Sequence, residues 1–468
     1  MKNGIGEKTD DRVPVAIVSL GCPKNTVDSE AMAHLLKQHG FETVVEPRQA
    51  EVIIVNTCGF IAPAREESIS VIRRMARLKQ RHGRALVVAG CLAQRLGDEL
   101  LQIPGVDAVL GTGELERLPE VVRECLCGTT RGRAWVRDPE VPLGLPRLLS
   151  TGATAYLKIG EGCDRRCSFC IIPRLRGRYR SRPLPDVVAE AQGLVDAGAR
   201  ELVLVAEDTS RYGEDLYGKP MLAPLLEALA SASGARWIRV LYAYPHGFTE
   251  DAARVMAEQE TVVPYVDLPL QHISDGVLRR MGRPDRGDDI RRFLDRLRQM
   301  VPGIVLRSTF LLGFPGESEA DFRELLEFLR TYQLDHAGFF TFYPEPEAPA
   351  AAYPEQVPEE AKRRRWEEAV ACQAGVSLAL NRRLLGRELE ILVEASSQVR
   401  VLSMRGTGDR AAVGKRWLPE AVGRWAGQAP EVDGQVHVPG SRAQPGEFIR
   451  VRVEQAFAHD LVVVPMAD

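Results

Sequence analysis

The sequence predicts an α/β protein made of an N-terminal parallel-sheet domain, a partial (β/α)6 TIM-like barrel and a small C-terminal antiparallel β-barrel. Strands alternate with amphipathic helices over residues 13–127, and a second strand–helix series occupies residues 151–385. Short alternating strands separated by Gly and Pro then fill residues 386–468. Strand–helix alternation with uniformly apolar strands indicates a parallel sheet covered on both faces.

Bulk composition agrees with a soluble protein of several domains. A chain of 468 residues is too long for one hydrophobic core, and its 45% hydrophobic and 27% charged residues are ordinary values. The net charge of -3 provides no global basic field, so we expect neither a membrane nor a nucleic acid as partner. Met1–Arg12 is polar and lacks the apolar core of a secretion signal, which predicts a disordered extension and a cytoplasmic location.

The N-terminal series brings three distant cysteines to similar positions. The expected strands cover 15–20, 52–55, 85–89 and 106–110, and the expected helices about 26–39, 64–81 and 114–124. Cys22, Cys58 and Cys91 each follow one of the first three strands by two or three residues. The carboxyl ends of parallel strands are where open α/β sheets bind ligands, so we expect the three thiols to converge. The alternative is three unrelated buried thiols, which are common in cores.

Residues 128–150, rich in Gly, Pro and Arg, are predicted to be a linker to the barrel. The barrel strands are expected at 156–160, 201–206, 237–243, 265–270, 305–312 and 337–342, with helices at about 186–197, 221–232, 249–258, 275–281, 288–300 and 319–331. One charged helix should span Glu359–Leu385, and later strands should lie at 389–393, 399–404, 435–438, 448–455 and 461–464. Barrel active sites lie at the carboxyl ends of the strands.

The strongest motif is a tight cysteine loop after the first barrel strand. Cys163, Cys167 and Cys170 are separated by three and two residues, as iron–sulfur ligation on one loop requires. A structural zinc site would need a fourth ligand, and none lies nearby in the sequence. Three thiolates on a four-iron cluster leave one iron open to a small molecule.

This C-x3-C-x2-C motif, with Phe169 before its last cysteine, resembles the signature of the radical S-adenosylmethionine (SAM) superfamily. The resemblance implies that the open iron binds SAM and that an electron from the cluster cleaves SAM to methionine and a 5′-deoxyadenosyl radical. It also implies that the backbone of Phe169 contacts the adenine.

The order of the three parts is similar to the methylthiotransferase family over about residues 13–466. By position, Cys22, Cys58 and Cys91 would hold a second four-iron cluster. The implied cofactors are therefore two [4Fe-4S] clusters and SAM, which serves as methyl donor and radical source, and a flavodoxin or ferredoxin would donate electrons.

Two branches of that family are relevant, one acting on an adenosine in tRNA and one on an aspartate of ribosomal protein S-twelve. The stretches 19–25, 269–275 and 429–434 resemble the ribosomal-protein branch. Residues 386–468 contain ten basic and eleven acidic residues, whereas an RNA-gripping barrel should be clearly basic. We therefore expect methylthiolation of the aspartate β-carbon, with tRNA modification as the alternative. A non-catalytic iron–sulfur scaffold is a third hypothesis.

The remaining candidates surround the expected SAM site, where no catalytic residue beyond the cluster ligands is predicted. Five residues are predicted to bind cofactor: Phe169, Glu207, Gln271, Arg307 and Gly313. Glu207 departs from the family, which usually has Gln there, although a carboxylate could still bind the SAM amine. Five arginines between Pro173 and Arg182 could hold a carboxylate, with no single one favoured. Cys125, Cys127 and Cys372 are predicted to be plain thiols.

Overall fold

A computed structural model describes residues 12–80, 84–129, 132–148, 152–405 and 412–466, and for 80, 398–405 and 412–418 the backbone alone. The chain forms two compact units. The first comprises residues 1–150, 160–165 and 170–182, and the second comprises 151–159, 166–169 and 183–468. The expected polar extension at residues 1–11 lies outside the described part of the chain.

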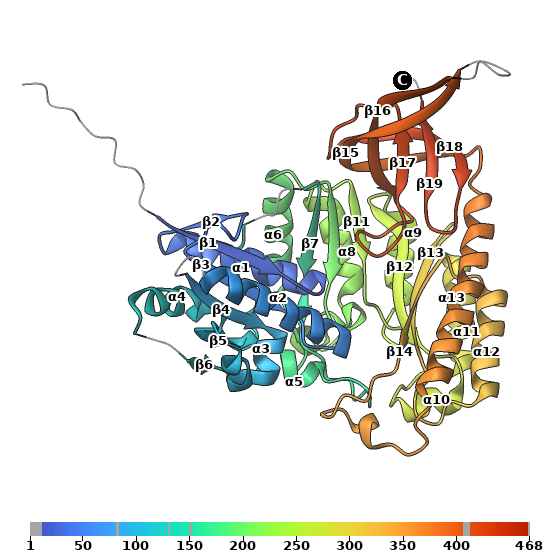
Figure 1. Ribbon diagram of the computed structural model, residues 1–468. Coiled ribbons are helices and arrows are strands. Elements are labelled where there is room, and N and C mark those ends of the chain that lie inside the picture. The colour runs from blue at the N-terminus through green and yellow to red at the C-terminus, as the bar shows by residue number, and fades with distance from the viewer. Residues whose placement is uncertain (1–11, 81–83, 130–131, 149–151, 406–411, 467–468) are drawn as a thin grey trace, which may run out of the picture. The chain divides into compact units, whose positions relative to one another are not determined.

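The first unit is built on a six-stranded sheet of order β2-β1-β3-β4-β5-β6 in which all pairs are parallel (Figure 1). Its strands are β1 (Val13–Ser19), β2 (Phe41–Val44), β3 (Val52–Thr57), β4 (Ala85–Gly90), β5 (Ala108–Leu110) and β6 (Arg133–Trp135). Its helices include α1 (Pro23–Gln38), α2 (Ala62–Gln80), α3 (Cys91–Leu96) and α4 (Leu118–Cys127). The parallel sheet predicted for this part is confirmed.

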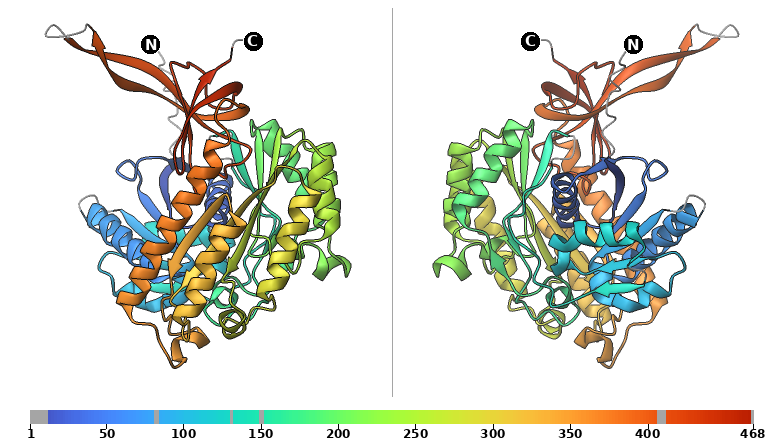
Figure 2. Two further views of the ribbon diagram at one scale, coloured as in Figure 1. Left: turned by 90° about the vertical axis from the view of Figure 1, so that its right-hand side faces the viewer. Right: turned by 90° about the vertical axis from the view of Figure 1, so that its left-hand side faces the viewer.

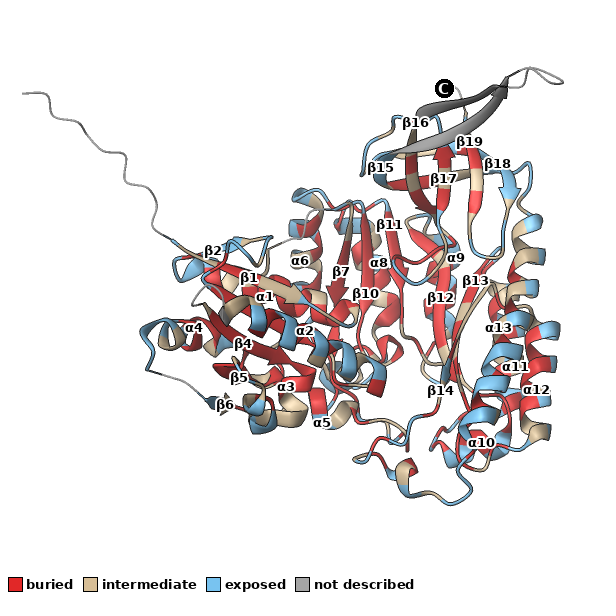
Figure 3. Ribbon diagram, viewed as in Figure 1, coloured by how far each residue is buried: buried red, intermediate tan, exposed pale blue. Residues whose placement is uncertain are grey.

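Both faces of this sheet are covered, as uniformly apolar strands require. Every residue of β3 and β4 is buried (Figure 3). Neighbouring residues of one strand divide between two separate cores: Ile54 and Val87 pack in one, and Ile53 and Val88 pack in the other. Side chains of a strand alternate between faces, so each core fills one side of the sheet.

The predicted linker 128–150 is partly wrong, because β6 pairs with β5 in the sheet and Trp135 is buried in its core. β6 has only three residues and lies in a stretch rich in Gly and Arg, so no hydrophobic period marks it as a strand. The short β2 was missed for the same reason.

The second unit contains a parallel sheet of order β14-β13-β12-β11-β10-β7, which confirms the partial barrel of six strands. The strands are β7 (Thr154–Lys158), β10 (Glu201–Val205), β11 (Trp237–Val240), β12 (Val262–Gln271), β13 (Val305–Leu312) and β14 (His336–Thr341). Helices connect them (Figure 2): α6 (Leu184–Asp196), α8 (Leu222–Ala232), α9 (Glu250–Glu258), α10 (Asp275–Arg280), α11 (Gly287–Met300), α12 (Glu319–Tyr332) and, after the last strand, α13 (Glu359–Arg382).

The chain ends in a closed barrel of order β15-β16-β17-β19-β18. Its strands are β15 (Glu388–Arg405), β16 (Ala412–Trp425), β17 (Val436–Pro439), β18 (Phe448–Ala456) and β19 (Leu461–Pro465). The prediction of five strands holds, but β15 is one strand where two were expected, and β16 was missed because its Gly and Pro residues are typical of turns. β17 and β19 are parallel, so the barrel is not wholly antiparallel as expected.

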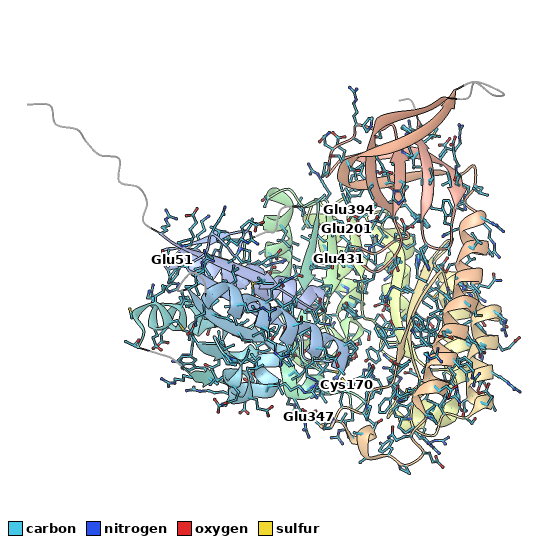
Figure 4. The ribbon with its side chains drawn as sticks, viewed as in Figure 1. Glu51, Cys170, Glu201, Glu347, Glu394 and Glu431 are labelled. Atoms are coloured by element: carbon cyan, nitrogen blue, oxygen red, sulfur yellow. The ribbon has the colours of Figure 1, made fainter. Side chains whose placement is uncertain are left out.

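A buried ionic network joins this barrel to the amino ends of the six-stranded sheet. Glu201, the first residue of β10, binds Arg239 at 2.7 Å and Arg424 of β16 at 2.6 Å. Glu394, labelled with Glu201 in Figure 4, binds Arg424 at 2.7 Å. Burial alone would raise the pKa of Glu201, but the two guanidinium groups outweigh it and lower the pKa to about 2. The network thus fixes the barrel at the end of the sheet opposite to the predicted active site.

No helix within the described ranges is long and apolar enough to cross a lipid bilayer.

Candidate functional site

The first candidate site lies where β1, β3 and β4, three neighbouring parallel strands, end. Cys22 precedes α1, Cys58 follows β3 directly, and Cys91 is the first residue of α3. The structure thus places all three cysteines at the carboxyl ends of neighbouring strands, as expected. The charge of Cys22 acts on Cys58, and the charges of Cys22 and Cys58 act on Cys91. Their role as cluster ligands stays a prediction.

Glycines allow the loops that carry these cysteines to interlock. Gly21 has φ +96°, and a Cβ there would lie 2.8 Å from the Cβ and 3.3 Å from the Sγ of Cys58. Gly90, before Cys91, has φ +91°, and a Cβ there would lie 2.8 Å from the carbonyl oxygen of Thr57. Both positions therefore exclude a side chain on conformational and on steric grounds.

Asn25 links the same loops by hydrogen bonds. Its Nδ2 donates to the carbonyl oxygens of Leu20 at 2.8 Å and Thr57 at 3.0 Å, and its Oδ1 lies 3.9 Å from the Sγ of Cys91. Asn56 returns a bond from its Nδ2 to the carbonyl oxygen of Asn25 at 3.0 Å. The loops after β1, β3 and β4 are thus held at fixed separations, as a preorganised ligand site requires.

Burial disfavours the thiolate form of Cys58 and Cys91 unless a positive charge lies beside it. Desolvation raises the pKa of Cys91 to about 12 and also raises the pKa of Cys58. The Arg176 guanidinium opposes both shifts. Metal binding requires thiolates, so a metal centre at this site would itself supply the positive charge that keeps these groups ionised.

Arg176 is the arginine that the sequence could not single out from its run of five. It ends the short helix α5 (Ile172–Arg176) and is 1% exposed. Its Nη1 donates to Glu161 at 2.9 Å, and its Nη2 donates to Asn25 at 2.5 Å and to Asp28 at 2.9 Å. Asn25 and Asp28 lie on α1, directly after Cys22. The segment after the cysteine loop therefore carries the cation of the first cysteine site.

The second candidate site is the cysteine loop, whose sulfurs face backbone N–H groups. The N–H of Arg165 donates to the Sγ of Cys163 at 3.4 Å, and the N–H of Ile172 donates to the Sγ of Cys170 at 3.4 Å. Cys170 is labelled in Figure 4. Hydrogen bonds of this kind favour the thiolate form and are usual around iron–sulfur clusters.

Of the two neighbours of Cys167, Ser168 is hydrogen-bonded to the end of α10 and the turn after it, and Arg166 lies close to that turn. The N–H of Ser168 donates to the carbonyl oxygen of Met281 at 2.9 Å. The Ser168 hydroxyl donates to the carbonyl oxygen of Arg280 at 2.8 Å. A Cβ on Gly282 would lie 2.6 Å from the carbonyl oxygen of Arg166. The buried Arg283 follows directly, and the sequence analysis did not identify it.

Four of the five predicted cofactor residues lie on the cysteine loop or after a barrel strand. Phe169 packs edge-on against Phe314, with ring centroids 6.4 Å apart. Glu207 follows β10. Gln271 ends β12 with φ +69°, a costly conformation that clusters at functional sites. Gly313 follows β13 with φ +70°. Their contacts with a cofactor remain predictions.

The glycine turn after β13 is closed by Glu317, another residue that the sequence analysis did not assign. Its carboxylate accepts the N–H groups of Gly313 at 2.6 Å and Phe314 at 3.1 Å, and it binds Arg365 at 3.0 Å. Burial nevertheless raises the pKa of Glu317 to about 7. One carboxylate oxygen accepts both N–H groups of the turn and the other binds Arg365, so Glu317 fixes the shape of the turn.

Arg307 has a different environment from the other four. Near the amino end of β13, its Nη1 binds Asp267 at 2.8 Å and its Nε lies 3.3 Å from Asp433. Asp433 belongs to the loop between β16 and β17 and also accepts the hydroxyl of Tyr265 at 2.7 Å. The guanidinium thus links the sheet to the C-terminal barrel, and nothing around it supports the prediction that it binds SAM.

The three other cysteines lie outside both sets. Cys125 and Cys127 are at the end of α4, and Cys372 is on α13. Burial raises the pKa of Cys125 to about 12 and also raises that of Cys372, which leaves both mainly as thiols. Their assignment as plain thiols remains a prediction.

Across the described ranges, no group of three His, Cys, Asp or Glu side chains is arranged to hold a single metal ion. A multi-iron cluster, in which each thiolate binds a different iron, spreads its ligands wider than one ion does. The soft thiolate donors, their N–H partners and the nearby arginines fit such a cluster better than a lone cation.

Three family models match successive parts of the chain. Residues 14–111 match the uncharacterized protein family UPF0004, residues 157–329 match the radical SAM superfamily, and residues 414–465 match the TRAM domain. The radical SAM match supports binding of SAM and an iron–sulfur cluster.

Curated relatives match nearly the whole chain. "Ribosomal protein uS12 methylthiotransferase RimO" of Moorella thermoacetica is 47% identical and covers 95% of this chain and 97% of its own length. The protein of the same name from Geobacter sulfurreducens is 43% identical, with 96% and 97% covered. Among solved structures, the radical SAM methyltransferase TsrM of Kitasatospora setae, with cobalamin and a [4Fe-4S] cluster bound, has a TM-score of 0.55 at 18% identity, covering 72% of this chain and 74% of TsrM. That likeness concerns the fold alone.

Proposed function

Because the chain belongs to the RimO family of radical SAM methylthiotransferases, we propose that it transfers a methylthio group to the β-carbon of an aspartate in ribosomal protein uS12. The relatives' names supply the substrate class. The observation that carries the proposal is the convergence of Cys22, Cys58 and Cys91 at one sheet edge, because a radical centre alone would not need a second set of three cysteines.

The two cysteine sets divide the chemistry. Cys163, Cys167 and Cys170 would hold a cluster whose open iron binds SAM, and SAM supplies the radical and the methyl group. Cys22, Cys58 and Cys91 would hold a second cluster that supplies sulfur. The chain's own groups prepare these sites: N–H donors favour the loop thiolates, and Arg176 offsets the burial of Cys58 and Cys91.

The glycine turn Gly313–Gly316 would present its main chain to the ligand, and its glycines leave no room for side chains. Glu317 holds the turn, and at Gly313 a Cβ would lie 2.3 Å from the Cγ of Lys362. Such a turn lets a ligand approach the main chain closely. Glu207 follows β10 and Gln271 ends β12, two strands of the same sheet with β11 between them, and both would orient SAM rather than exchange protons with the target.

Mass spectrometry tests the function directly. The reconstituted full chain would be incubated anaerobically with SAM, dithionite and purified uS12, and in parallel with tRNA. We expect a methylthio group on one aspartate of uS12 and formation of 5′-deoxyadenosine. Absence of 5′-deoxyadenosine would support a non-catalytic scaffold instead, with an electron carrier as its expected role.

Modification of tRNA in place of uS12 would establish the alternative branch. The near-neutral C-terminal segment argues against it, because ten basic residues are balanced by eleven acidic ones from Gly386 to Asp468. An RNA-binding barrel gains its affinity from phosphate neutralisation, whereas a module of this charge suits a basic protein partner better. A flavodoxin or ferredoxin is the expected electron donor.

A further inference from the structure

The turn after α10 places a buried arginine against the cysteine loop. Gly282 is packed on Arg166, and Ser168 is bonded to Met281 and Arg280, so both neighbours of Cys167 are fixed on this turn. Arg283 is the next residue, and it is 6% exposed. Its place at the thiol therefore follows from the backbone contacts on both sides of Cys167.

The guanidinium of Arg283 is held at one end and unsatisfied at the other. Its Nη2 donates to the carbonyl oxygen of Pro269 at 2.5 Å, and its plane lies over the ring of Tyr244, 4.3 Å from the centroid. Its Nε and Nη1 are buried and have no hydrogen-bond partner among the described residues. A buried donor without a partner is costly, and a charged one more so.

The electrostatic surroundings indicate what these donors face. Cys167 is among the groups whose charge acts on Arg283, together with Tyr244 and Asp285. The carboxylate nearest in sequence, Asp285, is itself buried, and its Oδ2 has no hydrogen-bond partner in the described part of the chain. Cys167 is thus the residue of the cysteine loop that the backbone contacts place beside Arg283.

We propose that Arg283 is a positioning residue that donates N–H hydrogen bonds to the Cys167 thiolate of the bound cluster and raises the cluster's reduction potential. This inference rests on the proposed function only in taking Cys167 as a cluster ligand. An added electron makes the cluster and its thiolates more negative, and a fixed cation with N–H donors stabilises that state in a low-dielectric site. Arg283 would therefore ease the reduction that precedes SAM cleavage.

Cys163 and Cys170 receive their N–H bonds from the backbone, which substitution cannot remove. Cys167 is the thiol of the loop with an identified side-chain donor. Its donor can therefore be changed without altering the loop, which makes the inference testable in the full chain.

The experiment is an EPR-monitored redox titration of reconstituted full-length protein, comparing wild type with Arg283→Gln and Arg283→Lys. The cluster in question is identified by the change of its EPR signal when SAM is added. Arg279→Gln is the matched control, because Arg279 lies four residues earlier on α10 and is exposed.

We expect full iron content in all variants, a lower midpoint potential in Arg283→Gln, an intermediate value in Arg283→Lys and no change in Arg279→Gln. An unchanged potential in Arg283→Gln with full iron content would overturn the inference. If Arg283→Gln loses iron, Arg283→Lys decides. A lowered midpoint potential in Arg283→Lys supports the inference, while an unchanged midpoint potential or loss of iron in this variant overturns the inference.

The readout also separates this inference from the proposed function. Failure to modify uS12 with the expected shift in potential would remove the proposed function alone. Modification of uS12 with no shift would remove only the role of Arg283.

Discussion

The two cysteine sites are constructed in opposite ways. The first collects Cys22, Cys58 and Cys91 from three strand ends, and its arginine is saturated, because Arg176 binds Glu161, Asn25 and Asp28. The second carries its cysteines on one loop, and its arginine, Arg283, keeps two buried nitrogens without partners in the described chain. A guanidinium whose donors all have protein acceptors stabilises the fold, whereas one with donors left over can still bind a ligand.

Of the changes proposed here, removal of Arg176 should cause the largest loss of stability, and it should affect the first cysteine site. Arg176→Met leaves Asp28 and Glu161 buried without their cation, and breaking such a network costs about 3–5 kcal/mol. We expect urea unfolding of the first unit to show a free energy of unfolding lowered by this amount, and we expect the N-terminal cysteines to lose their iron. Arg123→Met, at an exposed position of α4, is the control. An unchanged unfolding midpoint would show that the network is dispensable.

Glu201 is one carboxylate between two arginines, whereas Arg176 is one arginine between two carboxylates. The stability that Glu201 contributes should depend on pH. Its pKa lies near 2 instead of 4.5, so its stabilisation is complete above pH 4.5 and is lost as the pH falls towards 2. The shift corresponds to about 3 kcal/mol. Thermal unfolding between pH 7 and acid should show this loss in wild type but not in Glu201→Gln. Equal slopes in the two proteins would refute the assignment.

Substituting Gly90 should damage the first site more than the second. In Gly90→Ala, the new Cβ meets the Thr57 carbonyl at a position with φ +91°, which costs about 1–3 kcal/mol. We expect weaker iron retention at the N-terminal set with the SAM-responsive cluster intact, measured by iron analysis and EPR. Gly193→Ala is a matched control, since its Cβ would meet nothing within 4 Å and it lies inside α6. Equal iron loss from both sites would contradict this view.

The smallest effect is expected at the cysteines outside both sets. Cys127→Ser, at the exposed end of α4, should change stability by less than about 0.5 kcal/mol and leave the iron content at the wild-type value. Iron loss in this variant would give Cys127 a ligand or relay role that the present assignment excludes.

The sequence revealed the two sites through different signals. The spacing of Cys163, Cys167 and Cys170 is local and visible directly, whereas Cys22, Cys58 and Cys91 required the inference that parallel strands end at one edge. Arg176 was noted within its run of five but could not be singled out, since it acts on a site more than eighty residues away in sequence. Arg283 was not identified, since it is fixed by a turn that carries no pattern. Strand alternation aimed Arg307 at the barrel interior but could not reveal its two carboxylate partners.

We propose that two separate three-cysteine sites each hold a cluster, and iron analysis of reconstituted full-length protein can count these clusters. Wild type should bind about eight irons per chain, with about four remaining when either cysteine set is changed to alanine. The SAM-induced EPR change should vanish only with the loop set. About four irons in wild type, or an unchanged count after removal of the N-terminal set, would contradict the claim.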